Sequence, residues 1–278
     1  AEGAAAPRRE RVTLTLGSLI QAQGVLRADA GGQRVERAAV VIGPGKLDLP
    51  AAGAIALAVD LKSLDLDRFL PLLQDAQASA AQGDARLTTL SVRTGRLEVG
   101  GRQFNDVTLR AHALAPGGWQ AVVAARELAG ELTWRPEGKG RVVARLSHLT
   151  HPEAAPNPAP GSGEVRELPA LSIVADSYTV NGRSLGRLEL EAVNEQQLWR
   201  LTKLELAAPE GRLAATGAWR AAPRGERSEL DVRIETSDAG KYLARFGQPD
   251  TIAQGAATLG AKVTWNGPVY AIDYPTLT

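Results

Sequence analysis

Two histidines and a nearby carboxylate are the residue types best suited to bind a metal ion. His148 and His151 are three positions apart and Glu153 follows, a set that could hold zinc if a helix placed both imidazoles on one face. Pro152 and the surrounding loop-like composition argue against a helix here. We therefore interpret both histidines as solvated loop residues.

Two further motifs could bind ions. The stretch GPGK at residues 43–46 shares glycines and a lysine with phosphate-binding loops, but it lacks the spacing and the Ser or Thr after Lys of a Walker loop. It predicts a plain turn. Asp65 and Asp67 could form a catalytic or cation-binding carboxylate pair, yet their place at the start of an expected helix favours a role in complementing the helix dipole.

The rest of the composition narrows the function classes. The 278 residues include three His and no Cys or Met, which excludes thiol chemistry, disulfides and Cys-based metal sites. No Ser-His-Asp spacing or Gly-rich loop stands out, so we predict a protein that is not an enzyme and uses no metal or cofactor. The 32 Lys and Arg are offset by 31 Asp and Glu, which argues against a nucleic-acid partner. No apolar run approaches the roughly 20 residues that span a bilayer, so we expect any anchoring segment to lie outside this sequence.

Most of the chain alternates apolar and polar residues with a period of two. Leu188 and Leu190, for example, are separated by Glu189, which predicts a strand with one apolar and one charged face. Turns rich in Gly and Pro punctuate these runs densely and predict antiparallel meandering strands. Parallel pairs would need a helix between strands, and the pattern does not suggest one.

Three segments interrupt the strand pattern. Residues 63–82 have helical spacing, with Ser63 as a possible N-cap, and residues 237–246 predict a short helix capped by Ser237 or Asp238. The predicted organisation is strands at 1–61, a helical connector at 62–85, a β-repeat at 86–151, a Pro- and Gly-rich linker at 152–167, a second β-repeat at 168–236, the short helix at 237–250 and a further β segment from 251 to 278.

The two β-repeats are similar to one another at a spacing of 81 residues. Leu90-Ser91-Val92 matches Leu171-Ser172-Ile173, and Gly101-Arg102 matches Gly182-Arg183. The second copy reads LPALSIVADSYTVNGRSLGRLELEA from Leu168, followed by Trp199, Gly-Arg-Leu, Trp219 and a helix entered through Ser-Asp-Ala-Gly. This pattern resembles the YhdP branch of the AsmA-like proteins of Gram-negative envelopes, over roughly residues 54–278.

The resemblance implies a mostly β fold: an elongated, curved antiparallel sheet of repeats, open as a groove in the manner of a β-taco, with two or three short α-helices. It also implies a periplasmic section of a parent chain anchored in the inner membrane. The implied function is to carry phospholipids between the inner and outer membranes along a hydrophobic groove. The implied partners are phospholipid acyl chains, neighbouring repeats of the parent chain, and the membrane through segments outside this sequence.

The residues alone leave two arrangements open for the apolar faces. Two sheets could close on each other as a dry sandwich, or one sheet could curl around something apolar. The strand pattern by itself favours the sandwich, whereas the resemblance favours the groove. Candidate groove-lining residues, for each of which a dry core contact is the alternative, are Leu97, Val99, Leu109, Ala111, Trp119, Val123, Leu132, Trp134, Leu188, Leu190, Trp199, Leu201, Leu213, Trp219, Val232 and Ile234.

The tryptophans recur near strand ends, and this position is compatible with two roles. They could pack between repeats or contact lipid headgroups at a groove rim. An alternative function for the whole chain is a β-repeat scaffold of the envelope, in which exposed strand edges pair with other strands and no lipid is conducted.

Overall fold

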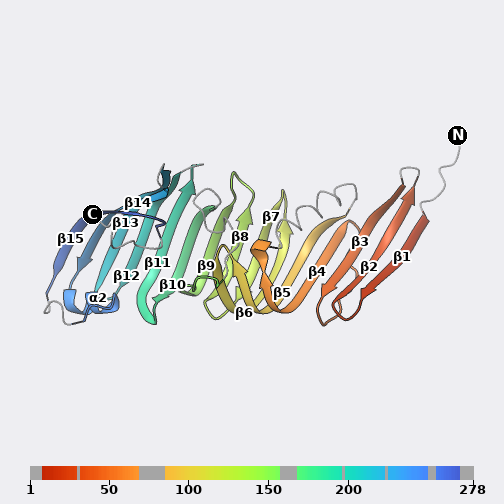
Figure 1. The fold of residues 1–278 in the computed structure, drawn as a ribbon, viewed down its shortest axis with the longest axis horizontal. Helices are drawn as coiled ribbons and strands as arrows, with labels where there is room; N and C mark the ends of the chain where they lie inside the picture. Colours follow the sequence, from red (N-terminus) through yellow and green to blue (C-terminus); the bar gives the residue numbers. More distant parts are fainter. Residues whose placement is uncertain are drawn as a thin grey trace. The chain divides into compact units, whose positions relative to one another are not determined.

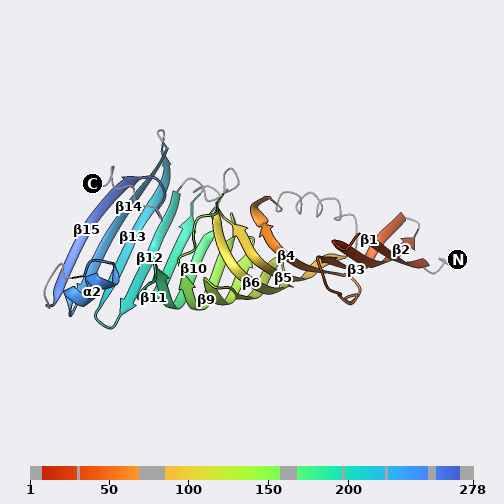
Figure 2. The same ribbon diagram turned by 60° about the horizontal axis from the view of Figure 1, so that its bottom comes forward.

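A computed structural model gives the fold of this chain and describes residues 8–29, 32–68, 85–156, 168–195, 198–222, 225–249 and 255–269. The described residues are mostly β-strand, which confirms the predicted fold class. They divide into two compact units, Ala1–Ala125 with Ala155–Ala159 (unit 1) and Arg126–Ala154 with Pro160–Thr278 (unit 2). Within each unit the strands lie side by side in chain order (Figures 1 and 2).

Unit 1 is one sheet of long strands. Its elements are β1 (Arg8–Leu16), β2 (Ile20–Asp29), β3 (Gly32–Ile42), β4 (Ala54–Asp65), β5 (Arg86–Val99), β6 (Arg102–Leu114) and β7 (Gly118–Ala124). The first strand is exposed along its whole length, and Leu14 and Leu16 are each 62% exposed. Burial begins with Val25 on β2 and continues on β3, where Ala39 and Val41 are buried.

Unit 2 is also one sheet, with a short helix near its end. Its elements are β8 (Leu128–Arg135), β9 (Arg141–Thr150), β10 (Ala170–Val180), β11 (Arg183–Asn194), β12 (Leu198–Ala208), β13 (Gly211–Ala222), β14 (Gly225–Thr236), α2 (Ala239–Arg245) and β15 (Ala257–Asn266). The β10–β11 turn shows why the chain reverses where it does. Asn181 and Gly182 have φ values of 49° and 75°, which the tight turns of hairpins require and which this residue pair tolerates well.

Three strand pairs are parallel, which corrects the prediction of antiparallel meanders alone. They are β3 with β4, β4 with β5, and β9 with β10. Neighbouring parallel strands need a long connection, because the chain must return to the end at which the previous strand began. The connections of these pairs are residues 43–53, 66–85 and 151–169, and the last two overlap the predicted helical connector and the Pro- and Gly-rich linker.

The helix expected from Ser63 begins later than predicted. Ser63 lies within β4, and the helical residues that the structure describes are 66–68; the remainder of that prediction, residues 69–82, lies outside the described residues. Asp65 caps this start, because its Oδ1 accepts a hydrogen bond from the Arg68 backbone N–H at 3.1 Å. The Pro-rich linker predicted at 152–167 is described only as far as residue 156.

The second predicted helix is α2. Its N-cap is Asp238, one of the two candidates, whose side chain accepts from the Lys241 backbone N–H at 3.1 Å. Figures 1 and 2 both place α2 beside one end of the strands of unit 2.

Candidate functional site

The feature of unit 2 best able to bind a ligand is one face of its sheet, from β11 to β15. Strand register aligns the residues of this face in rows that cross five strands. We call the following three rows the apolar rows: Leu188, Leu206, Leu213, Ile234 and Leu259; Leu190, Leu204, Ala215, Val232 and Ala261; and Ala192, Leu201, Gly217, Leu230 and Val263.

Burial along the first of the apolar rows falls from β11 towards β15. Leu188 and Leu206 are buried, Leu213 and Ile234 are half-buried, and Leu259 is 57% exposed. The strands of each unit belong to one sheet in chain order, so the described residues contain no second sheet that would close a dry sandwich. The rows therefore form an aliphatic surface that the described residues cover only in part.

One end of this surface is closed by α2. The ring of Phe246 packs against the cluster around Leu188 and Leu206. Tyr242 is only 1% exposed, and its hydroxyl donates to the Leu206 carbonyl at 3.5 Å. The Tyr242 and Phe246 rings meet edge to face at 5.3 Å, a favourable geometry for an aromatic pair. The helix thus places its aromatic side on the apolar face.

A salt bridge anchors α2 to the turn between β12 and β13. The Arg245 guanidinium donates to both oxygens of the Glu210 carboxylate, through Nε at 2.8 Å and Nη2 at 3.0 Å, and its Nη1 donates to the Ser184 carbonyl at 3.1 Å. Both side chains are about three-quarters buried, so water screens the pair less than it screens a surface pair. The hydrogen bond from Arg245 holds the pKa of Glu210 below its ordinary value of 4.5.

Acid is expected to weaken this anchor. Because the folded-state pKa of Glu210 is lowered, its contribution to stability is complete above pH 4.5 and is lost as the pH falls through the lowered folded value. Urea titrations should show that the free energy of unfolding falls between pH 6 and pH 3, and that it falls less in Glu210→Gln than in the wild type. Glu137→Gln is the control, because Glu137 lies in the exposed β8–β9 turn. Equal pH profiles for the wild type and Glu210→Gln would contradict this prediction.

High pH is expected to lower the free energy of unfolding through ionisation of Tyr242. Burial raises the pKa of its phenol from 10.0 to about 12, so the folded state favours the neutral form. The resulting stability is complete below pH 10 and is lost as the pH rises through about 12. Unfolding of the wild type and of Tyr242→Phe, compared from pH 8 to pH 11.5, should show the steeper loss in the wild type. A parallel decline in both proteins would show that Tyr242 does not titrate with unfolding.

The other end of the apolar face is closed by a row that contains three tryptophans. Register aligns Asn194, Trp199, Trp219, Ser228 and Trp265 across β11–β15. The indole N–H of Trp199 donates to the Pro169 carbonyl at 3.1 Å, and that of Trp265 donates to the Pro268 carbonyl at 3.0 Å. The three indoles are at most 4% exposed. They therefore pack the sheet against its connecting segments, which favours the packing role over contact with headgroups.

Trp119 and Trp134 have different surroundings. Trp119 is half-buried and pairs with Ala113 across β6 and β7. Trp134 lies near the end of β8 and is 39% exposed. Its indole nitrogen lies so close to Gly140 that a Cβ at position 140 would force the indole or the backbone to shift. Among the five tryptophans, Trp134 is the one with an exposed ring.

The opposite face of unit 2 carries charges that pair with one another. A ladder of ion pairs crosses β10–β13 with N···O distances from 2.6 to 3.7 Å, and its members in order are Asp176, Arg187, Glu189, Lys203, Glu205 and Arg212. The hydrogen bond from Lys203, and next that from Arg187, lowers the pKa of Glu189. Exposed pairs of this kind add little stability, but they make this face strongly hydrophilic. The sheet of unit 2 therefore has one aliphatic and one ionic face.

Unit 1 repeats the aliphatic face on β3–β7. Register aligns two rows: Val40, Leu57, Leu90, Ala111 and Ala121; and Ile42, Val59, Val92, Leu109 and Val123. Of the predicted lining residues, Leu109, Ala111 and Val123 belong to these rows. Leu97 and Val99 lie further along β5, opposite Phe104 and Arg102 respectively.

In unit 2 the structure brings together six of the predicted lining residues in the apolar rows: Leu188, Leu190, Leu201, Leu213, Val232 and Ile234. Leu132 lies on β8 beside the buried Ala144 of β9. Sequence reasoning missed Leu204 and Leu206, because a β-bulge at Thr202 and Lys203 shifts the alternation of β12. Leu204 and Leu206 thereby come to the same face as Leu201, and their spacing from Leu201 was the signal available in the sequence.

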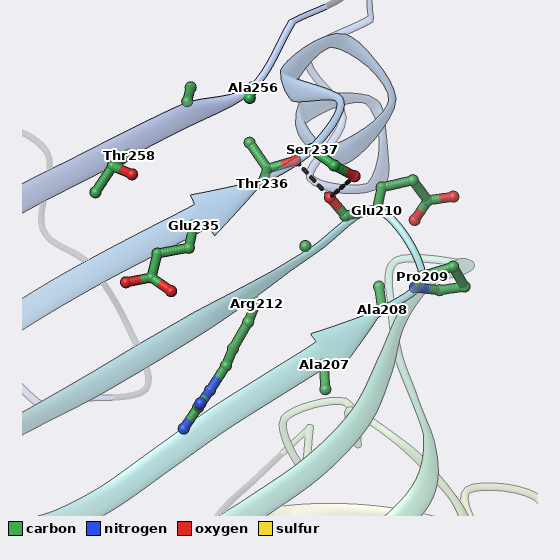
Figure 3. Close-up of a pocket in the computed structure, with 12 residues that line it drawn as sticks. Ala207, Ala208, Pro209, Glu210, Arg212, Glu235, Thr236, Ser237, Ala256 and Thr258 are labelled. Carbon is green, nitrogen blue, oxygen red and sulfur yellow. Dashed lines mark hydrogen bonds between the residues drawn. The ribbon is translucent and has the colours of Figure 1, made fainter.

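A recess of about 700 Å³ lies where β12–β15 meet the turn at Pro209 (Figure 3). The hydroxyls of Thr236 and Ser237 donate to the Glu210 carbonyl at 2.6 and 3.2 Å and join this turn to the start of α2. The charged groups of the lining are already engaged, since Arg212 binds Glu205 and Glu235 binds Arg233. The lining therefore offers no converging acid, base and nucleophile.

Asp67 and His151, two of the residues first considered for chemistry, have other partners, and His148 lies within β9 rather than in the predicted loop. Asp67 accepts the backbone N–H groups of Gly100 and Gly101 at 2.8 and 3.1 Å, so its carboxylate joins the helix start to the β5–β6 turn. The His151 ring nitrogen lies 3.3 Å from the Tyr178 hydroxyl. Within the described ranges, no three His, Cys, Asp or Glu side chains gather where they could hold a metal ion.

Comparisons with known proteins place the chain in a family. Comparison with curated proteins finds no match, and comparison with solved structures finds none. In the described part of the chain, no helix has the length and apolar character needed to cross a membrane. A family model described as YhdP protein matches residues 1–278. Since that match spans the whole sequence, the chain belongs to the YhdP family.

Proposed function

We propose that this chain is a section of a periplasmic hydrophobic groove that carries phospholipids between the inner and outer membranes, in a parent protein anchored in the inner membrane. The observation that carries the proposal is the set of apolar rows in unit 2. Fifteen aligned positions form an aliphatic surface that is only partly covered, while the opposite face carries a ladder of ion pairs. Membership of the YhdP family supports the envelope setting.

Acyl chains would bind this surface through the hydrophobic effect. Each methylene that leaves water contributes about 0.8 kcal/mol, so covering four methylenes contributes roughly 3 kcal/mol. The half-buried members, such as Leu190, Leu213 and Val232, are aliphatic, without hydrogen-bonding groups that would hold a lipid in one position. A row of similar side chains lets a lipid move along the sheet without a deep energy minimum.

The two ends of the surface restrict where lipid would lie. α2 covers one end through Phe246, and the tryptophan row covers the other against residues 168–169 and 268–269. Acyl chains would therefore cross β11–β15 between these two boundaries. Phosphate-containing headgroups would point away from the aliphatic rows towards water, because desolvating a charge is costly.

Native mass spectrometry of the purified chain tests this function. The expected spectrum contains a species heavier than the protein by the mass of one or more phospholipids, and lipid extraction should identify the same masses. A spectrum that shows only lipid-free protein, from material extracted without detergent, would contradict the proposal.

An alternative function is a scaffold module of the envelope. It is favoured by β1, which pairs only with β2 among the described residues and exposes Val12, Leu14 and Leu16. Exposed strand edges of this kind recruit further strands. Association of the chain through β1 in a lipid-free state would favour this function over lipid transport.

A further inference from the structure

A second site lies in unit 1, on the face of the sheet opposite its aliphatic rows. Residues 44–46 overhang β4, β5 and β6 and leave a recess of about 260 Å³. This volume lies below the range of roughly 300–1,000 Å³ usual for drug-sized ligands, so the recess suits a small group. The charged residues that line it are Lys46, Arg93, Arg110 and Asp60.

Strand register explains how the cations converge. Arg93 pairs with Thr108, and Ser91 pairs with Arg110, across β5 and β6. The two arginines are therefore diagonal neighbours on one face, at a typical Cα separation of about 7–8 Å, and each faces a hydroxyl residue. Their neighbours Val92 and Leu109 belong to the aliphatic rows, which places both arginines on the other face.

These cations differ from those of unit 2. There, Arg187, Arg212 and Arg220 each bind a carboxylate on the polar face. Among the described residues, no hydrogen bond or ion pair engages the side chains of Lys46, Arg93 or Arg110. Asp60 lines the recess and lies opposite Arg93 in register, so the lining carries three cations and one carboxylate. Neighbouring like charges destabilise a sheet unless a counterion joins them.

The GPGK stretch at residues 43–46 places Lys46, the third cation of the recess, over the sheet. Gly43 has φ of 96°, and a Cβ at this position would collide with the Asp60 carbonyl oxygen, so only glycine lets the loop approach β4 this closely. The Gly43 N–H donates to the Leu19 carbonyl at 2.7 Å. No helix follows within residues 47–53, so the stretch is not a Walker loop. Its lysine instead projects charge over the sheet.

We propose that this recess, which we call the Lys46 site, binds a phosphate-type oxyanion. Two guanidinium groups offer paired N–H donors that match phosphate oxygens, and the hydroxyls of Ser91 and Thr108 offer further donors. The carboxylate of Asp60 repels an oxyanion and therefore lowers the affinity of the recess for it. The oxyanion is either free in solution or part of an anionic headgroup at a membrane surface. The site does not depend on lipid in the apolar rows, because those rows belong to unit 2 and the Lys46 site belongs to unit 1.

Calorimetric titration of the whole chain with inorganic phosphate, at constant ionic strength in chloride buffer, tests the Lys46 site. We expect one binding site, about tenfold weaker in Arg93→Gln and in Arg110→Gln, and tighter in Asp60→Asn. Arg96→Gln, an exposed position on the same strand, is the matched control and should bind as the wild type does. Circular dichroism verifies that each variant is folded. No binding by the wild type, or equal binding by Arg93→Gln and Arg96→Gln, would overturn the proposal.

Vesicle sedimentation separates the two sources of the oxyanion. If the headgroup is the ligand, phosphatidylglycerol vesicles should bind the chain, phosphatidylcholine vesicles should not, and free phosphate should compete. If the ligand is a free oxyanion, phosphate should bind in calorimetry while both kinds of vesicle leave the chain in solution. Vesicle binding that Arg93→Gln and Arg110→Gln leave unchanged would count against the Lys46 site.

Discussion

Replacing Trp219 by alanine is expected to lower the free energy of unfolding by about 3–5 kcal/mol, as for other large aromatic residues in a core. Trp219 is fully buried at 0% exposure and lies between Trp199 and Ser228 in register. Its removal leaves a cavity at the point where the sheet packs against its connecting segments. Urea unfolding followed by circular dichroism measures the loss.

Trp134→Ala is the matched control for this substitution. Trp134 is 39% exposed, so its truncation removes less contact and should cost about 1 kcal/mol. A Trp219→Ala protein no less stable than Trp134→Ala would mean that the tryptophan row does not hold unit 2 together.

Leu213→Asp is expected to reduce the phospholipid bound to the purified chain about tenfold. Leu213 is half-buried in the apolar rows between Leu206 and Ile234, and a carboxylate there would have to lose water when acyl chains cover the face. A tenfold loss corresponds to about 1.4 kcal/mol, a small part of the cost of burying a charge. Lipid extraction and native mass spectrometry give the bound amount.

Ala214→Asp is the control, because it places the same charge one residue away on the ionic face, opposite Arg233. It should leave the bound lipid unchanged. Leu190→Asp provides a second test on β11 in case Leu213→Asp is poorly folded. Equal lipid content in Leu213→Asp, Leu190→Asp and Ala214→Asp would contradict binding at the apolar rows.

Alternation in the sequence was sufficient to predict the strands and the aliphatic side of most of them. Leu188, Leu190, Val232 and Ile234 lie on the predicted face because β11 and β14 run without a shift through these positions. The face of β12 beyond Leu201 could not be predicted in this way. A bulge adds one residue, and a single added residue exchanges the two faces of the strand that follows.

The parallel pairs were beyond the reach of a local pattern. Alternation gives each strand two faces but not the direction of its neighbour, so residues 43–46 are predicted as a plain turn rather than as part of a connection between parallel strands. The helix start was misplaced for a related reason. Ser63 and Asp65 are both suitable N-caps, and the pairing of β4 with β5 continues to Asp65, which leaves Asp65 as the cap.

The role of the tryptophans could not be predicted from their positions in the sequence. Their recurrence near strand ends fitted both packing and a headgroup rim. Their burial and the hydrogen bonds of Trp199 and Trp265 distinguish the two roles. Trp199 donates to the Pro169 carbonyl, 30 residues away in sequence, and Trp265 donates to the Pro268 carbonyl, three residues away. The sequence likewise predicts only a turn at the GPGK stretch. The arginines that lie near it in the structure, Arg93 and Arg110, come from β5 and β6, so no local pattern connects them with Lys46.

Site-specific photo-crosslinking along β13 tests the central claim most directly. A photoreactive amino acid is placed in turn at positions 212 to 216 in cells, and phospholipid attached to the chain is detected by mass spectrometry. Contact with acyl chains at the apolar rows predicts adducts at 213 and 215 and their absence at 212, 214 and 216, because successive side chains of a strand face opposite sides. Adducts at none of these positions, or at all of them alike, would contradict a lipid-carrying face.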